Sequence, residues 1–435
     1  MAGADAGEQP AGRVAIASAG VDDEIYSLLT LIVRAHVYPW YHAAISRDPD
    51  RDFARAITAT LAHTLHEIKR RVQLDDCRAL IELITVDVPS VLAQHVHDLD
   101  DARAKAGSAC AHNTTPEAMY HSLAPHIAVS VDSTGAPVVD ALYLRTLTDQ
   151  VLARVMPARD YGAQAARTIA QELVANVVLG AVFTTLSQPY FLHQLLLRLL
   201  EDHATRSHAT QSSTRQSLAD LCAAFLSSAL SLLLVAVAAL RFVAASLATP
   251  IGRSRNLVDP IHCLLQAWTA RKSSLVARSL DLASLVTSLA PALADRAAVH
   301  LLREHLMQDR VVIATVRLLK AALFPGGQPP EARLPPPSPD EQDALRERCE
   351  HALANALPRE SSAAAPFLRS DADVVAALVV CVMMPGSHNA DAPLMLAREL
   401  LRPISCRVAN VHAYLFLLDT LISRLFPDMC GKEVI

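Results

Sequence analysis

One stretch of the sequence narrows the possible folds more than any other, the twenty residues Leu221–Leu240, which carry no charge. As a helix these residues would extend roughly 30 Å, which is the thickness of the hydrocarbon core of a bilayer. The tract is open to three interpretations: a segment embedded in a membrane, the fully buried central helix of an α-helical protein, or the wall of a cavity that holds lipid.

The composition favours helices over sheets. Apolar residues make up 52% of the 435 residues, yet aromatic residues make up only 4%, so the apolar surface comes from Leu, Ala and Val. Such residues favour helices, and the low glycine count of 13 argues against a glycine-rich nucleotide-binding fold. We therefore expect an all-α fold.

Charge and cysteine usage exclude further classes. The net charge is −5 and no long basic run occurs, so nucleic acid is not expected as a partner. The eight cysteines lie far apart without a CxxC pair, which indicates buried thiols in a reducing compartment rather than a zinc or disulfide framework. Residues 1–20 are small and polar, have no secretory signal and are expected to form a disordered tail that starts in the cytosol.

Apolar periodicity predicts a succession of helices from Asp22 onward. Pro39 should end the first of them, and Asp48-Pro49 should cap the next. Later helices are expected at roughly 75–84, from Pro89 to a charged end near 103, at 116–123, 139–155, 164–186, 190–200, from 259, and at 274–288, 294–307, 311–324, 338–357, 370–384, 394–401 and 411–426.

Two segments between these helices have sequence patterns that predict other structures. Residues 127–139 alternate apolar side chains around a polar turn, so they predict either a small hairpin or an ordered loop. Residues 325–339 are rich in proline and predict an exposed linker. Ser338-Pro-Asp-Glu341, which begins at the end of this linker, is typical of a capping box.

Several short motifs follow one another at defined spacings in the first half of the chain. Trp40-Tyr41 is followed by Ser46, Asp48 and Phe53, by an amphipathic helix, and then by His95. Further on, Tyr143-Leu144-Arg145 leads to Arg167 and Glu172, an apolar helix and Gln188-Pro189. In order and spacing, residues 21–205 resemble the PX-associated (PXA) domain of sorting nexins, and most closely the stand-alone fungal type that lacks a PX domain.

The resemblance implies a division of the chain. A multi-helical PXA domain over 21–205 would be followed by a polar linker at 206–217, a very apolar helix or hairpin at 218–248, and a C-terminal helical region at 256–435. In related sorting nexins a C-terminal nexin region packs on the PXA domain and closes a shared apolar cavity. The resemblance implies that residues 256–435 play this part, although no motif in them matches residue by residue.

The function implied is non-enzymatic binding of phospholipid or phosphoinositide, extending to lipid transfer, on the cytoplasmic face of endomembranes such as the endoplasmic reticulum, endosome or vacuole. The expected partners are an acyl lipid and an endomembrane surface, and no metal or cofactor is expected. The alternative is a membrane-anchored scaffold or tether in vesicle traffic without a lipid cavity. The residues expected to line a cavity are Leu173, Val174, Val177, Val178, Val182, Phe183, Leu186, Leu226, Leu230, Leu233, Leu234 and Val237.

The charges around the apolar tract argue against a simple span. Arg241, Arg253 and Arg255 follow it, which weakly favours a cytosolic C-terminal flank. A single span would then put the PXA-like region across the membrane, in conflict with lipid handling in the cytosol. A hairpin with 242–247 as its second arm, a shallow insertion or a buried helix is therefore preferred.

Few residues suggest catalysis or metal binding. His63 and His66 lie one helical turn apart, but no third ligand is indicated. His95 near Asp98 would fit a general base with its carboxylate, but it more simply satisfies a helix end. No GxSxG, P-loop or GxGxxG motif occurs, so we expect no enzyme. Trp40-Tyr41 fits either a membrane interface or, preferably, a packed structural corner.

Overall fold

The described part of the chain is helical almost throughout, which confirms the all-α fold class. The structure is a computed structural model. It describes residues 17–44, 52–73, 77–108, 114–132, 135–180, 182–208, 256–269, 291–306, 308–324, 337–356 and 392–430, together with residues 247, 284, 285 and 288.

The described elements before residue 209 are mostly helices, with one short β-hairpin. They are α1 (Ala19–His36), α2 (Tyr38–Ala44), α3 (Asp52–Gln73), α4 (Arg78–Glu82), the π-helix η2 (Leu83–Asp87), α5 (Val88–Ala106), α6 (Pro116–Leu123), β1 (Val129–Val131), β2 (Pro137–Val139), α7 (Ala141–Val155), α8 (Ala158–Gly162), α9 (Gln164–Glu172), the π-helices η3 (Leu173–Leu179) and η4 (Val182–Leu186), and α10 (Pro189–His208).

The described elements after residue 255 are all helical. They are α12 (Asp259–Thr269), α14 (Pro291–Leu301), the π-helix η5 (Leu302–Leu306), α15 (Asp309–Leu323), α16 (Pro339–Ala356), α18 (Ala392–Leu401), the 3₁₀ turn η8 (Arg402–Ser405), α19 (Arg407–Leu425) and the 3₁₀ turn η9 (Pro427–Cys430).

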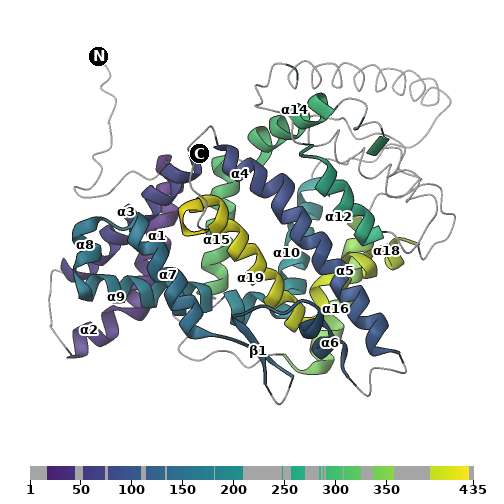
Figure 1. The fold of residues 1–435 in the computed structure, drawn as a ribbon, viewed down its shortest axis with the longest axis horizontal. Helices are drawn as coiled ribbons and strands as arrows, with labels where there is room; N and C mark the ends of the chain where they lie inside the picture. The colour runs from purple at the N-terminus through teal and green to yellow at the C-terminus, as the bar shows by residue number, and fades with distance from the viewer. Residues whose placement is uncertain are drawn as a thin grey trace.

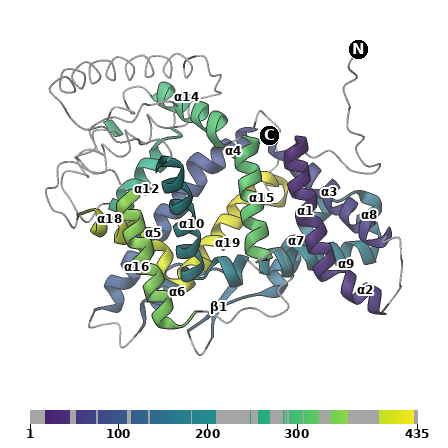
Figure 2. The same cartoon turned by 180° about the vertical axis from the view of Figure 1, so that it is seen from behind.

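Two long helices run through the middle of the molecule. In Figure 1 the continuous helix of α4, η2 and α5 crosses the centre, and α19 lies beside it. On one side lie α1, α3, α7, α8 and α9, and on the other lie α10, α12, α16 and α18 (Figure 1). Seen from behind, α15 lies along α1 (Figure 2), and the two helices are in contact. Helices from the C-terminal half therefore contact the N-terminal half at several places.

Four apolar clusters of buried side chains hold these elements together. The first core joins α1, α3, α7, α9 and η3 with the end of α15, and includes Leu29, Ile32, Leu152 and Phe324. The second core joins α5 and α6 with the start of α19. The third core joins the hairpin, α7, η3 and η4 with the middle of α19. The fourth core joins Ile81 with Leu257, Val299 and Leu302.

The sequence predicted two helices across residues 75–103, and this was wrong, because one continuous helix covers Arg78–Ala106. Pro89, expected near a helix start, lies within it. A proline in a helix clashes with the carbonyl four residues before it and removes one hydrogen bond. The π-helix η2 ends at Asp87, two residues before Pro89, and its wider turn makes room for the ring.

Other local signals were read correctly. The first helix ends at His36, although a second one, α2, begins at Tyr38 with Pro39 in its first turn. Ser338 and Glu341 form a capping box, in which the Ser338 N–H donates to the Glu341 carboxylate at 2.8 Å and the Glu341 N–H donates to Ser338 Oγ at 3.3 Å. The expected end of the following helix at Leu200 was wrong, because α10 continues to His208.

The segment at 127–139 forms the hairpin rather than the loop. Val129 pairs with Val139 in antiparallel register. Gly135 closes the turn with a φ of 82°, in the left-handed region where a glycine has no steric penalty. Two cysteines depart from the expected burial, because Cys263 on α12 and Cys430 in the last turn are exposed.

Some expected segments lie outside the described residues. These are the N-terminal tail up to residue 16, the cap at Asp48-Pro49, the apolar tract 221–240, most of the expected helix at 274–288, the linker from 325 to 336 and the expected helix at 370–384.

Candidate functional site: an apolar helix held by the C-terminal helix

The helix Gln164–Leu186, formed by α9, η3 and η4, is one of two described helices long and apolar enough to cross a membrane. The other is Arg78–Ala106. Core helices of soluble proteins share these properties, and Arg78–Ala106 is packed between α12 and α19 in this way. In Gln164–Leu186 only 24% of the most apolar 18-residue window is buried. Of the two, this helix therefore keeps more apolar surface outside the protein core.

The expected lining residues of this helix divide into two groups. Leu173, Val177 and Val178 pack in the first core. Phe183 packs in the third core against Val411 and Leu415 of α19.

The remaining three, Val174, Val182 and Leu186, are half-buried and belong to none of the four apolar clusters of the described residues. Val182 and Leu186 are four residues apart in a π-helical segment, close to one of its wide turns, and Val174 lies just under two such turns earlier, so the three side chains lie towards the same side of the helix.

Ion pairs hold the N-terminal end of this helix. Arg167 donates to both carboxylate oxygens of Asp149 on α7, at 2.7 and 2.5 Å, and its guanidinium lies over the Tyr161 ring at 4.6 Å from the centroid. Arg145 of α7 pairs with Glu172 at 2.9 Å. Arg167 and Glu172 therefore both fix this helix to its neighbour α7.

The C-terminal helix α19 holds the other end. The Tyr414 hydroxyl donates to the Leu186 carbonyl at 3.0 Å, and Asn410 Nδ2 donates to the Ser187 carbonyl at 3.0 Å. These bonds satisfy carbonyls that a helix end leaves without a partner. Burial raises the pKa of Tyr414 to about 12, so the hydroxyl remains protonated and can donate.

Asp419 joins the middle of α19 to Tyr143 in α7 and to His126 just before the hairpin. The Tyr143 hydroxyl donates to one oxygen of Asp419 at 2.5 Å, and His126 Nε2 lies 3.0 Å from the other. His126 Nδ1 accepts from the Ala128 N–H, so Nε2 carries the proton in the neutral ring and donates. Burial raises the pKa of Tyr143 above its ordinary value. Asp419 therefore receives two hydrogen bonds.

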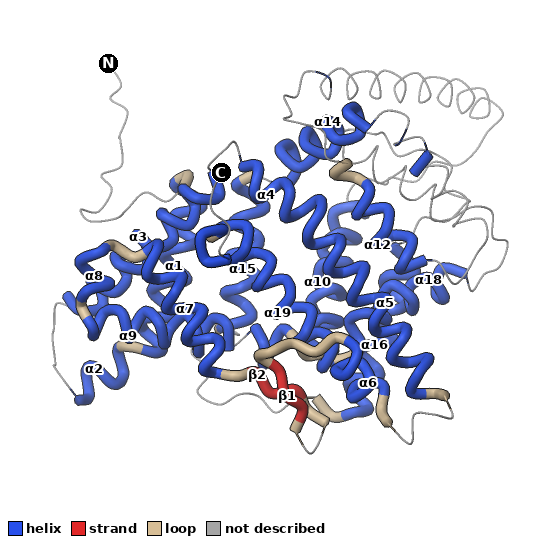
Figure 3. The backbone as a smooth tube through the Cα atoms, viewed as in Figure 1, coloured by secondary structure: helices blue, strands red, loops and turns tan. Residues whose placement is uncertain are grey.

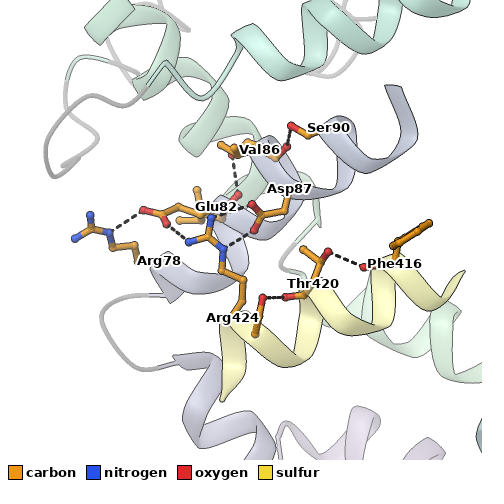
Figure 4. A network of polar contacts seen from close by, with 11 residues as sticks. Arg78, Glu82, Val86, Asp87, Ser90, Phe416, Thr420 and Arg424 are labelled. Atoms are coloured by element: carbon orange, nitrogen blue, oxygen red, sulfur yellow. Dashed lines mark hydrogen bonds and ion pairs between the residues drawn. The ribbon is translucent and has the colours of Figure 1, made fainter. Parts of the chain in front are cut away.

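The far end of α19 is fixed by Arg424, shown in Figure 4. Its guanidinium donates to both oxygens of Asp87, at 2.5 and 2.8 Å, and to Glu82 at 2.7 Å. Arg78 also donates to Glu82, at 3.0 Å, from a more exposed position. Both carboxylates border the π-helix η2, so the network ties α19 to the place where the central helix widens.

Buried histidines connect α5, α6 and α19. His95 Nε2 lies 3.2 Å from the Pro403 carbonyl, which can only accept, so Nε2 carries the proton and Nδ1 accepts from the Tyr120 hydroxyl at 2.9 Å. His412 Nδ1 donates to the Val408 carbonyl at 2.9 Å, and its Nε2 accepts from His121 Nδ1 at 3.0 Å. His95 thus sits in mid-helix as a bridge between elements, not at the end of its own helix.

Acid is expected to destabilise this protein through His412. Burial, with the neighbouring histidines as smaller contributors, lowers the pKa of His412 from 6.5 to about 4. Between these values the unfolded chain binds a proton that the folded chain excludes, so the free energy of unfolding should fall as pH falls from 6.5 towards 4. Urea unfolding across this window measures the effect.

Two variants separate His412 from other groups. His412→Asn keeps donor and acceptor capacity but cannot titrate, so it should flatten the pH dependence. His63→Gln replaces an exposed histidine and should leave that dependence unchanged. Equal slopes in the wild type and His412→Asn would contradict this role.

Some of the remaining motif residues lie in the described part of the chain, and there they serve packing or helix starts. The Tyr41 ring stacks on Phe53 with centroids 4.1 Å apart, which agrees with a packed corner. Pro189 is the first residue of α10. Ser46 and Asp48, the Trp40 side chain, and the expected lining residues Leu226, Leu230, Leu233, Leu234 and Val237 lie outside the described part.

Sequence reasoning missed the polar residues of α19. Asn410, Asp419 and Arg424 were not singled out, although all three bond to the N-terminal half. For Asp419 and Arg424 the signal was one acid and one base within the mostly apolar run Tyr414–Phe426, whereas nothing in the sequence marked Asn410. His63 is exposed, and among the described residues no three His, Cys, Asp or Glu side chains are placed to hold a metal ion.

Comparison with known proteins gives one family and one relative. The family model described as "PXA domain" matches residues 18–199. The protein called PXA domain protein 1 from Schizosaccharomyces pombe is 23% identical over 172 residues, which cover 40% of this chain and 32% of that protein. The chain thus matches about a third of the length of this curated relative. No solved structure matches the chain significantly.

Proposed function

We propose that the protein binds acyl lipids without acting on them as an enzyme, because residues 18–199 match the PXA domain model and the motifs in this part resemble those of sorting nexins. The ligand class is phospholipid, phosphoinositides included, and lipid transfer between endomembranes is the proposed use. The proposed site of action is the cytoplasmic face of the endoplasmic reticulum, endosome or vacuole.

The observation that carries the proposal is the partly exposed apolar side of the helix Gln164–Leu186. One side of this helix packs into the first and third cores, while Val174, Val182 and Leu186 remain half-buried outside them. A strip of aliphatic side chains left in contact with water is unfavourable, and an acyl chain that covers it gains about 0.8 kcal/mol per buried CH₂.

The helix ends suit a lipid with a polar head. Charged pairs surround the N-terminal end, Arg167 with Asp149 and Arg145 with Glu172, whereas the strip itself carries no charge. An acyl chain lying on the strip would therefore leave its headgroup near one polar end. The tract 221–240, which the sequence also suggests as lining, lies outside the described residues.

Mass spectrometry of lipid extracted from the purified chain tests the proposal. We expect phospholipid in roughly stoichiometric amount. Making the strip polar with Val174→Ser and Val182→Ser should lower that amount at least about tenfold, since each substitution removes about two methyl groups that the acyl chain would cover, at about 0.8 kcal/mol per carbon, and about 1.4 kcal/mol corresponds to tenfold.

The control is Val312→Ser, which makes the same change at an exposed valine on α15, away from the strip. It should leave the lipid content unchanged. A wild-type chain that purifies without phospholipid would reject the proposal and favour the scaffold or tether instead.

A further inference from the structure

Three large aliphatic side chains protrude at the base of the hairpin. Ile127 is 91% exposed, Leu142 is 70% exposed and Val138 is 48% exposed. They come from the turn before β1, the first turn of α7 and the middle of β2. Most large apolar side chains in the described part are covered, so three such exposures within sixteen residues form a distinct feature.

The hairpin register brings these side chains to one edge. The Asp140 N–H donates to the Ala128 carbonyl, so Ile127 lies across from the start of α7, where Leu142 is located. Val138 pairs with Ser130 on the exposed face of the hairpin. Figure 3 shows both strands at the edge of the molecule, outside the layer of helices.

The opposite face of the hairpin leads to the proposed lipid helix. Val129 and Val139 belong to the third core, together with Leu179 and Phe183 of the helix Gln164–Leu186. A single layer of side chains therefore separates the exposed side chains of the hairpin from the helix Gln164–Leu186, which is proposed to contact the acyl chain.

We propose that Ile127, Val138 and Leu142, hereafter the hairpin edge, insert into the interfacial region of a lipid bilayer and dock the protein there. This inference rests on the proposed lipid function, which supplies the reason for contact with a membrane. The docked edge brings the end of the lipid helix to the bilayer from which the lipid enters.

The size of the hairpin edge fits a bilayer better than a protein partner. Three aliphatic side chains present on the order of 300 Å², whereas a stable protein interface buries roughly 800 Å² on each partner. A bilayer requires no minimum footprint, because each inserted side chain contributes according to its own buried area.

The charges near the hairpin edge indicate whether docking depends on electrostatic attraction or on apolar insertion. Asp132 and Asp140 are exposed beside the hairpin, and the nearby cation, Arg145, is paired with Glu172. No excess of positive charge is therefore available in this stretch to attract anionic lipid. Docking should depend on apolar insertion, so it should occur on phosphatidylcholine vesicles and change little with phosphatidylserine or salt.

Flotation of the full chain with phosphatidylcholine vesicles tests the hairpin edge. The wild type should float, and the double variant Ile127→Ser with Leu142→Ser should lose at least about tenfold in vesicle partition. Met395→Ser, which replaces an exposed apolar side chain on α18, should float like the wild type. Leu142→Trp should strengthen binding, because tryptophan favours the bilayer interface.

The outcomes separate this inference from the proposed function. A wild type that does not float, a double variant that floats equally well, or an equal loss in Met395→Ser overturns the hairpin edge. So does a change of oligomeric state in the double variant without a change in flotation, which would identify a protein interface. Lipid carried by the purified chain is measured separately, and the double variant should retain it.

Discussion

A chain that ends before Cys406 is expected to lose cooperative folding of residues 18–199. The helix α19 supplies Val408, Val411 and Leu415 to the second and third cores, and each of these side chains is almost fully buried. Burial of three such side chains contributes together roughly 5–9 kcal/mol, which is comparable with the 5–15 kcal/mol net stability of a domain. Thermal unfolding by circular dichroism should therefore show no sharp transition.

A chain that ends after Cys430 is the matched control, because it keeps α19 and η9 and removes only residues 431–435. It should unfold as cooperatively as the full chain. A sharp transition in the shorter chain at the temperature of the full chain would mean that the N-terminal half folds without α19.

The second large effect is expected from Arg424→Ala, which should lower the free energy of unfolding by about 2–4 kcal/mol. The substitution leaves Asp87 and Glu82, both largely buried, without the guanidinium that neutralises them. Glu82 keeps its pair with the more exposed Arg78, but Asp87 loses both of its hydrogen bonds from Arg424, and the two carboxylates repel each other more strongly. Denaturant unfolding at neutral pH measures the loss.

Arg78→Ala serves as the comparison, because Arg78 contacts only one of these carboxylates and is more exposed. Exposed ion pairs contribute up to about 1 kcal/mol, so this variant should be much closer to the wild type. Equal losses in the two variants would contradict the central place of Arg424 in the network.

Local features of the fold could be predicted from the sequence because neighbouring residues decide them. The extent of the helix Gln164–Leu186 follows from its apolar periodicity and from Gln188-Pro189 directly after it. The capping box of Ser338 and Glu341 depends on four consecutive residues. The PXA resemblance similarly rests on short motifs in order, such as Arg167 and Glu172.

Features that depend on distant residues could not be predicted in the same way. The helix that continues through Pro89 requires the π-helix η2, which is tied to Arg424 more than 300 residues later in the chain. The division of the lining residues also depends on distant packing, because Phe183 is covered by α19 and Val177 by the first core. Periodicity shows that a side of a helix is apolar, but not which partner covers it.

The hairpin illustrates an ambiguity that packing resolves. Its alternating residues allowed an ordered loop as well as two strands, since strands of three residues carry little pattern. Val129 and Val139 pack on Phe183 and Val411, and this contact favours the paired strands.

The most direct test of the lipid account is photo-crosslinking with a phospholipid that carries a diazirine near the end of its acyl chain. The purified full chain is loaded with this lipid and irradiated, and the modified residues are identified by mass spectrometry of peptides. The account predicts crosslinks in the helix Gln164–Leu186 at or beside Val174, Val182 and Leu186, and their loss in the Val174→Ser, Val182→Ser variant. Crosslinks that fall elsewhere in the chain, or that persist unchanged in this variant, would contradict it.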